Sequence, residues 1–222
     1  MNFLLVTSMS APNKLSDLYF SQLEKEGIPY RVYPNQMTSP NDGNLGNCTR
    51  EWRRWAEENP CDRLIVTDAW DVLCYGTREQ LEESLTDFPP YPVFAAERNC
   101  YPEPHLAKEI EIPGPWSFVN GGMFTSSPED LYNWCNLIDL HPNTDPSMLM
   151  QQWLNRRLRE KDPLVKIDWK TKLFYCHFMD RGELEVRDGR PYNTVHGTLP
   201  VLHHFNGSWP WEPFLAQMEA YV

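Results

Sequence analysis

Residues 63–73 read RLIVTDAWDVL, an apolar run followed directly by two aspartates. Residues 64–66 stand together without polar alternation, which predicts a short strand covered on both faces by other elements. Such strands belong to parallel or mixed sheets with helices on either side, and these sheets bind ligands beyond the carboxyl ends of their strands. We therefore expect an α/β fold whose ligand site includes Asp68 and Asp71.

The two aspartates have the chemistry of a metal site. Asp68 and Asp71 are three residues apart, so in a continuing strand their side chains would point to opposite faces. The chain must turn after Asp68 before both carboxylates meet one ligand. Two such oxygen ligands suit Mg²⁺ or Mn²⁺, which keep other positions open for water or phosphate oxygens. From the pair alone, the alternative is that Asp68 ends the strand and caps the next element.

The composition narrows the class of protein. No linker divides the 222 residues, so we expect one domain over residues 1–222. The formal charge of −11 disfavours broad binding to phosphate backbones. The start of the chain has a short apolar run without a basic segment, which predicts a first strand and not a signal peptide, and no later stretch is long enough to span a membrane. The six scattered cysteines favour reduced thiols and a cytoplasmic location.

The beginning of the chain predicts a β-α-β unit, the building block of nucleotide-binding α/β folds. Its first strand, residues 3–6, ends in Thr7 and Ser8. A helical pattern over residues 15–26 and a strand over residues 28–33 follow it.

A loop rich in Asn, Pro, Gly and Ser is predicted over residues 34–47. Thr49 is the expected N-cap of the next helix, which reaches Asn59.

Three further polar groups follow predicted strands: Glu97 after residues 91–96, the Asn120-Gly121-Gly122 segment after residues 116–120, and His204 with Asn206 and Gly207. The paired glycines would let the backbone come close to a ligand or turn sharply, and a bulge or tight turn is the alternative. Asp145-Pro146 has the sequence of a helix start, in which Asp145 would be the N-cap. A final amphipathic helix is predicted over residues 213–221.

Four of these segments together resemble the glycosyltransferase domain of procollagen lysyl hydroxylases and related collagen-type glycosyltransferases. Residues 67–73 (TDAWDVL) are similar to that family's D-x-aromatic-D strand end, and residues 204–207 (HFNG) to its H-x-N-G. Residues 93–102 (VFAAERNCYP) resemble its F-A-A-E-x-x-C-W-P segment, and residues 118–124 (FVNGGMF) its L-N-S-G-G-F block. The resemblance implies a GT-A type fold for nucleotide-diphospho-sugar transfer, with a mixed central sheet and helices on both faces.

The resemblance also implies the residue roles. Asp68, Asp71 and His204 would hold Mn²⁺, with Mg²⁺ as the alternative, and an imidazole ligand favours Mn²⁺. A cation held there would bridge the two phosphates of a UDP-sugar, and Trp70 would stack on the uracil. Around the donor we also expect Thr7, Ser8, Tyr101, Gly121, Gly122, Asn206 and Gly207, and near the transferred sugar Glu97, Asn120 and Asp145.

The implied activity is transfer of a hexose, galactose or glucose, from a UDP-sugar to a hydroxyl acceptor. Hydroxylysine is the family precedent for the acceptor, and another glycan or a hydroxylated nucleobase are the alternatives. The sequence departs from the family at Tyr101, which stands where the family has Trp, and at Asp145, the one acid where the family has a run of acids. Gly121-Gly122 lies in a block one residue shorter than the family's. No hydroxylase region follows, so a free-standing transferase is expected.

Two other functions fit part of the pattern. A metal-dependent phosphatase of the haloacid dehalogenase type also places two Asp after an apolar strand, but with D-x-D spacing and usually after the first strand of the chain. A module that binds a nucleotide-sugar or glycan without turnover is the second alternative, which the shifted acid at Asp145 leaves open. Tight UDP binding without UDP release from any donor would identify that module.

Overall fold

The computed structural model describes residues 1–9, 11–34, 43–207 and 210–219. Its centre is a six-stranded mixed sheet in the order β2-β1-β3-β6-β5-β7, in which β6 is antiparallel to both of its neighbours. The strands are β1 Phe3–Met9, β2 Tyr30–Pro34, β3 Arg63–Asp68, β5 Val93–Glu97, β6 Phe118–Ser126 and β7 Ile167–Asp168. The predicted mixed sheet is therefore confirmed.

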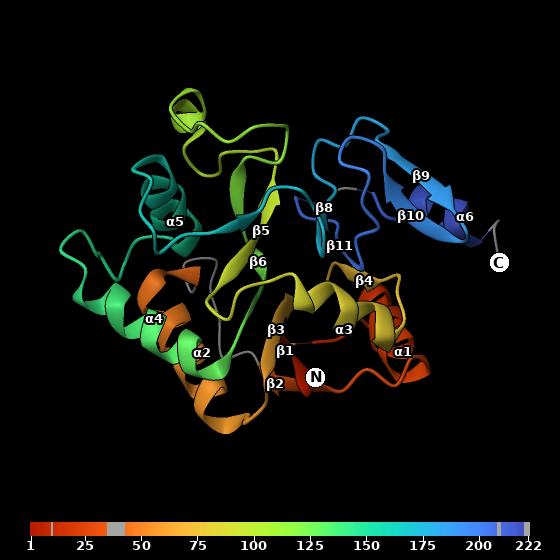
Figure 1. Ribbon diagram of the computed structural model, residues 1–222, viewed down its shortest axis with the longest axis horizontal. Helices are drawn as coiled ribbons and strands as arrows, with labels where there is room; N and C mark the ends of the chain where they lie inside the picture. The colour runs from red at the N-terminus through yellow and green to blue at the C-terminus, as the bar shows by residue number, and fades with distance from the viewer. Residues whose placement is uncertain (10, 35–42, 208–209, 220–222) are drawn as a thin grey trace.

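Two smaller sheets extend the structure. β4 (Val72–Cys74), β11 (Leu202–His204) and β8 (Phe174–Cys176) form a three-stranded sheet in the order β4-β11-β8. β9 (Leu184–Arg187) and β10 (Arg190–Asn193) form an antiparallel hairpin beside it (Figure 1).

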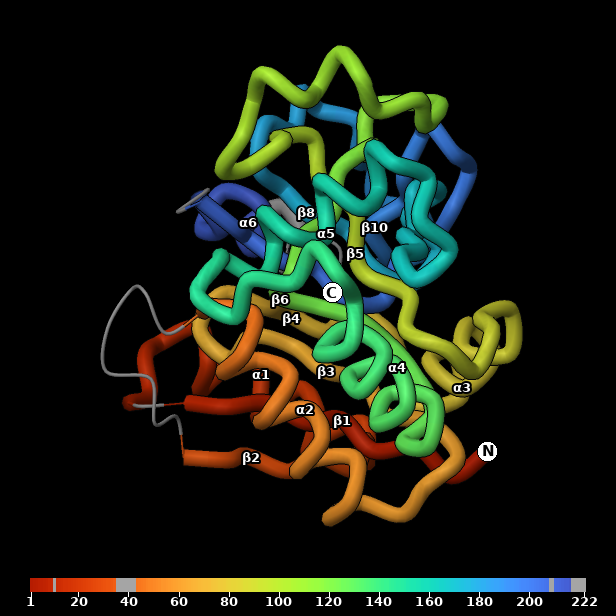
Figure 2. Tube along the Cα trace, turned by 90° about the vertical axis from the view of Figure 1, so that its left-hand side faces the viewer, coloured from red at the N-terminus to blue at the C-terminus, as the bar shows by residue number. Residues whose placement is uncertain are grey.

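Helices cover both faces of the central sheet, as the sequence predicts (Figures 1 and 2). On one face lie α1 Lys14–Lys25 and α3 Arg78–Thr86; on the other lie α2 Leu45–Glu58, α4 Pro128–Leu140 and α5 Met150–Arg159. A short 3₁₀ helix spans Pro104–Lys108, and α6 spans Glu212–Glu219. None of the helices in the described ranges is long and apolar enough to cross a membrane.

The apolar run in β3 joins the cores of the two faces. Ile65 packs into the cluster that contains α1 and α3, whereas Leu64 and Val66 pack into the cluster of α2, α4 and α5. All three side chains are buried, and burial of each such side chain contributes about 1.5–3 kcal/mol. The strand that carries Asp68 at its end is thereby fixed from both sides.

Two predicted helix starts are wrong. α2 begins at Leu45 and not after Thr49, because Asn44 is its N-cap and accepts a hydrogen bond from the Asn47 N–H at 2.9 Å. The predicted loop over 34–47 therefore overlaps α2, and its residues 35–42 lie outside the described residues. The last helix ends at Glu219, and residues 220 and 221 of its predicted span also lie outside that part of the chain.

α5 begins at Met150 and not after Asp145. The Asp145 Oδ1 atom instead accepts hydrogen bonds from the Ser147 N–H and hydroxyl, at 2.9 and 2.6 Å. The segment between Asp145 and the start of α5 runs beside the start of α2. There the Leu45 N–H of α2 donates to the Met148 carbonyl at 2.8 Å. This tertiary pairing holds the segment out of the helix.

Candidate active site

A tight turn brings Asp71 back toward Asp68. β3 ends at Asp68 and β4 begins at Val72, so three residues reverse the chain. Two contacts with the start of α1 hold this turn: the Trp70 indole N–H donates to the Ala11 carbonyl at 2.8 Å, and the Asn13 amide donates to the Trp70 carbonyl at 3.1 Å. Asn13 is also the N-cap of α1, so the turn is anchored to the helix that packs beneath it.

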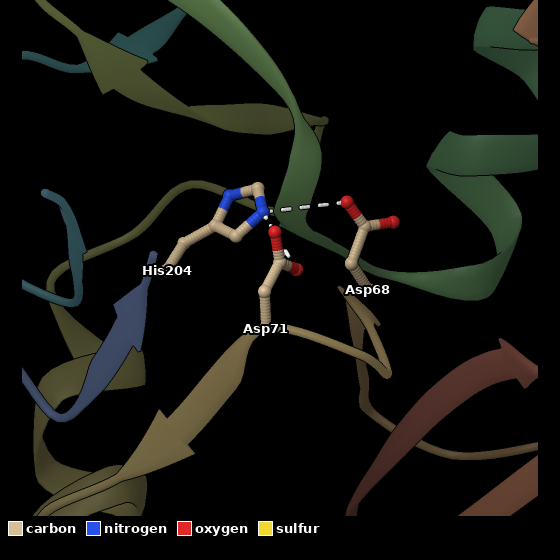
Figure 3. A group of neighbouring side chains, drawn as sticks. All are labelled: Asp68, Asp71 and His204. Atoms are coloured by element: carbon tan, nitrogen blue, oxygen red, sulfur yellow. Dashed lines mark ion pairs between the residues drawn. The ribbon is translucent and has the colours of Figure 1, made fainter. Parts of the chain in front are cut away.

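The imidazole of His204 reaches the turn from the other end of the chain. β11 pairs antiparallel with β4, with His204 opposite Val72, and the Phe205 N–H donates to the Asp71 carbonyl at 2.8 Å. The His204 Nε2 atom then lies 3.1 Å from Asp71 Oδ1 and 3.4 Å from Asp68 Oδ2 (Figure 3). Ligand atoms of all three side chains lie within 4.8 Å of one another.

The three side chains fit a divalent cation. The Nδ1 atom of His204 lies 3.0 Å from Asn120 Oδ1. Because an amide oxygen accepts hydrogen bonds only, Nδ1 carries the proton and Nε2 faces the carboxylates. Burial opposes a charge on His204, but the neighbouring carboxylates of Asp71 and Asp68 raise the pKa of this imidazole. Two carboxylates and one imidazole are a donor set that suits Mn²⁺.

Gly122 leaves the space that such a cation needs. A Cβ at this position would overlap Asp68 Oδ2 and His204 Cε1. Since even a methyl group cannot stand there, the strand backbone passes directly beside two of the candidate ligands, Asp68 and His204. The predicted role of the Gly-Gly pair, close approach of backbone to a ligand, agrees with this position.

A cavity of about 350 Å³ opens beside Asp68. It lies between the strand ends and the helices α2 and α5, and the residues that line it include Ser8, Asp68, Tyr101, Gly121 and Gly122 from the sequence prediction. Tyr101 is 52% exposed, so its ring borders the cavity and solvent. The volume is within the range of small-molecule sites.

Thr7 and Trp70 do not line this cavity. Thr7 is fully buried and its hydroxyl donates to the Thr67 carbonyl at 2.7 Å, because β1 continues to Met9 and places Thr7 inside the sheet. Trp70 is 41% exposed and lies on the side of the turn that faces α1. Its ring is available to a stacking partner outside the cavity.

Glu97 and Asn120 are both buried next to the candidate metal ligands, where Asn120 contacts His204. The Glu97 carboxylate accepts hydrogen bonds from the amides of Asn120, Asn206 and Gln151. Burial raises the pKa of Glu97 to about 7, against the opposing effect of these hydrogen bonds. Glu97 and Asn120 contact other side chains of the site and do not line the cavity. Their predicted contact with the transferred sugar stays a prediction.

Asn206 and Gly207 shape the chain after His204. The Asn206 Oδ1 atom accepts a hydrogen bond from the Phe178 N–H at 3.1 Å. Gly207 has a φ of +67°, and a Cβ there would overlap the Phe178 ring. Both residues therefore hold the strand end that carries the imidazole and do not line the cavity.

Asp145 does not line the cavity. Its exposed carboxylate is used by the turn with Ser147, whose hydrogen bonds lower the pKa of Asp145. Leu149, Met150 and Gln151 line the cavity in its place.

Several lining residues were missed in the sequence analysis, and Gln151 and Glu51 are among the polar ones. Gln151 is a polar residue on the inner side of α5, where its Oε1 atom accepts from the Gly121 N–H at 3.3 Å. A polar side chain in the first turn of this helix, next to buried apolar residues, is the sequence feature that could have predicted Gln151 as a site residue. Glu51 stands among exposed charges of α2, and no pattern separates it from them.

Residues 47–222 match the family model described as the PLOD GT domain. The chain belongs to the PLOD GT domain family. Among its relatives, it is 26% identical over 181 residues to procollagen-lysine,2-oxoglutarate 5-dioxygenase of Drosophila melanogaster, and 25% identical over 171 residues to the multifunctional procollagen lysine hydroxylase and glycosyltransferase LH3 of Homo sapiens. These matches cover 77% and 70% of the chain. The chain spans about a quarter of the length of these curated relatives, 25% and 22% respectively.

A solved structure supports the fold of this PLOD GT domain. The structure of a glycosyltransferase involved in the glycosylation of the major capsid of PBCV-1 matches 98% of both chains with a TM-score of 0.51 and 11% sequence identity. The predicted GT-A type fold is confirmed by this likeness and by the mixed sheet with helices on both faces. Membership of a glycosyltransferase family favours the transferase over the phosphatase interpretation.

Proposed function

We propose that this PLOD GT domain transfers a hexose, galactose or glucose, from a UDP-sugar to a hydroxyl acceptor, with Mn²⁺ as cofactor and Mg²⁺ as the alternative. The observation that carries the proposal is the convergence of Asp68, Asp71 and His204 at the edge of the cavity. Asp68 belongs to both the cluster and the cavity wall, and Gly122, which also lines the cavity, lies beside Asp68 and His204. A diphosphate at the cluster would therefore lie against a space of the size of a small ligand.

The protein side chains have distinct tasks in this proposal. Asp68, Asp71 and His204 would hold the cation, which when bound neutralises charge on the leaving diphosphate. Trp70, exposed next to the two carboxylates, would stack on the uracil. Ser8 at the end of β1 would hydrogen-bond the nucleoside, while Tyr101 would border the sugar or the acceptor.

The acceptor is proposed by chemical class. A hydroxyl group on a protein, as in hydroxylysine, agrees with the procollagen-lysine names of the relatives. A hydroxyl group of a glycan or of a modified nucleobase remains the alternative. The formal charge of −11 disfavours a long nucleic acid. We further propose a reducing, cytoplasmic environment, which the six free cysteines support.

A binding module without turnover is the second candidate. Of the described residues that line the cavity, Asp68 and Glu51 are those that carry a carboxylate, and Glu51 is paired with Arg54. The position of Asp145 outside the cavity leaves the site without the acid that the sequence assigned to the donor sugar. This observation favours binding without transfer.

UDP release from a panel of UDP-sugars, measured with Mn²⁺ and with EDTA, separates the two candidates. We expect slow hydrolysis of one donor that requires Mn²⁺, and its loss in Asp68→Ala and Asp71→Ala without loss of the fold. Glu111→Ala is the matched control, because this exposed carboxylate pairs with Lys161 far from the cluster in sequence. UDP binding without release from any donor would establish the binding module, and an unchanged rate in Asp71→Ala would refute the metal assignment.

A further inference from the structure

Glu97 is a buried carboxylate whose hydrogen-bond partners come from three other elements. It is 3% exposed and accepts from Asn120 in β6 at 3.3 Å, from Gln151 in α5 and from Asn206 after β11. Within the described ranges, no lysine or arginine forms an ion pair with it. A buried carboxylate held by amides alone is costly, since each hydrogen bond must offset part of the lost hydration.

This arrangement fixes how each amide is turned. An ionised carboxylate accepts hydrogen bonds only, so Asn120, Gln151 and Asn206 must each present the NH₂ group to Glu97. Their carbonyl oxygens then point away from it.

The freed carbonyl oxygens are used at the candidate active site. Asn120 Oδ1 accepts from His204 Nδ1 and from the Gly122 N–H, both at 3.0 Å. Gln151 Oε1 accepts from the Gly121 N–H at 3.3 Å. One carboxylate thus sets both the orientation of the imidazole and the backbone of the two glycines that border the cavity.

We propose that Glu97 is a positioning residue: through Asn120 it keeps the proton of His204 on Nδ1 and leaves Nε2 free to bind a divalent cation. The proposal rests on the metal site of the proposed function. If the Asn120 amide were reversed, its NH₂ group would face His204 Nδ1, which would have to lose its proton to accept. The proton would then be favoured on Nε2, the atom that faces Asp68 and Asp71.

A glutamine cannot replace Glu97 in this role. Asn120 and Asn206 donate to the Oε2 atom of Glu97, and Gln151 donates to Oε1. A glutamine NH₂ group in the place of Oε2 would oppose Asn120 and so disturb His204. In the place of Oε1 it would oppose Gln151, whose Oε1 atom holds the Gly121 N–H beside the ligands. Loss of a partner that orients a metal-binding histidine typically weakens metal affinity about 10- to 100-fold. Glu97→Gln keeps the size of the side chain, so this loss would come from hydrogen-bond direction.

The test is Mn²⁺ affinity, measured by electron paramagnetic resonance of the unbound ion, together with thermal unfolding. We expect wild-type protein to bind Mn²⁺ and Glu97→Gln to bind it about 10- to 100-fold more weakly. The matched control is Asp168→Asn, because Asp168 is a buried carboxylate in β7 that accepts three backbone N–H groups and does not touch the site. This control should lose stability and keep its Mn²⁺ affinity.

A compensating variant separates positioning from general destabilisation. In the double variant Glu97→Gln/Asn120→Asp, the introduced carboxylate accepts both from the NH₂ group of the introduced glutamine and from His204 Nδ1, so part of the affinity should return. Asn206 loses its acceptor there, which limits the recovery. If Glu97→Gln does not fold, Asn120→Leu removes the acceptor of the Nδ1 proton directly and should show the same loss of about 10- to 100-fold.

Three results would decide against the inference: wild-type affinity in a folded Glu97→Gln, an equal loss in Asp168→Asn, or no loss in Asn120→Leu where Glu97→Gln does not fold. Absence of Mn²⁺ binding by the wild-type protein would instead refute the metal site of the proposed function. The two failures are therefore distinguishable.

Discussion

Gly122 determines how closely the main chain approaches the candidate metal ligands. Its N–H is held by Asn120 Oδ1, and its Cα passes beside Asp68 and His204. The sequence indicated that the Gly-Gly pair mattered, since glycine pairs allow close approach of backbone. It did not indicate which glycine touches the ligands, because that depends on the pairing of β6 with β3, two strands far apart in the chain.

Gly122→Ala is expected to abolish Mn²⁺ binding at concentrations that saturate the wild type, because the added methyl group overlaps Asp68 Oδ2 and His204 Cε1. Calorimetric titration with Mn²⁺ measures this. Gly27→Ala is the control for the cost of replacing a glycine: Gly27 has a φ of +60° and open space around its Cα. That variant should lose about 1–2 kcal/mol of stability, because alanine is strained in the left-handed region, and keep its affinity. Equal affinity in Gly122→Ala would contradict the geometry of the cluster.

At the scale of elements, apolar patterns predicted the strands and helices better than polar residues predicted their ends. β3 followed from residues 64–66 alone, because burial on both faces leaves a continuous apolar run. The start of α5 was mispredicted because Asp145 has equally good hydrogen bonds in a turn, and the backbone of α2 decides between the two. The partners of Glu97 could likewise not be read from the sequence, since three separate elements supply them.

The sheet β4-β11-β8 contains a buried histidine pair next to the candidate ligand. His177 Nε2 lies 3.1 Å from His203 Nδ1, and His203 Nε2 lies 3.2 Å from the Pro200 carbonyl. Burial, opposed by the bond to Pro200 and assisted by the charge of Arg190, lowers the pKa of His203 to about 3. Burial and the neighbouring His203 and His204 also lower the pKa of His177.

These shifts make the stability of the protein pH-dependent. An unfolded chain protonates His203 below about pH 6.5, whereas the folded chain does so near pH 3. The contribution of this histidine is therefore complete above about pH 6.5 and is lost as the pH falls, by about 1.4 kcal/mol per pH unit. The test is how far the free energy of urea unfolding falls between pH 7 and pH 5. This fall should be about 2 kcal/mol smaller in His203→Asn than in the wild type. The same substitution at the exposed His105 is the control. An equal fall in the wild type and in His203→Asn would contradict the lowered pKa of His203.

At the scale of the molecule, the candidate metal site joins two sheets. Asp68 ends a strand of the six-stranded sheet. In the three-stranded sheet, Asp71 directly precedes β4 and His204 is the last residue of β11. The sequence resemblance groups these three residues as metal ligands, and in the structure their ligand atoms lie within 4.8 Å of one another. The antiparallel pairing that achieves this could not be read from local patterns.

Mn²⁺ and UDP together are therefore expected to stabilise the whole fold. A ligand at 100 times its Kd adds about 2.7 kcal/mol, which for a chain of this size corresponds to a rise in Tm of about 5–10 °C. Differential scanning calorimetry with and without EDTA measures the effect. Asp71→Ala should lose it, and an equal rise in Tm for that variant would show that the cation acts elsewhere.

The position of His204 in the chain also has a consequence for protein synthesis. Both aspartates leave the ribosome well before the imidazole, which follows only after every strand of the six-stranded sheet has been translated. A nascent chain that already contains the aspartate turn thus lacks one of the three ligands. The complete set of candidate ligands is present only in a chain whose central sheet has already left the ribosome.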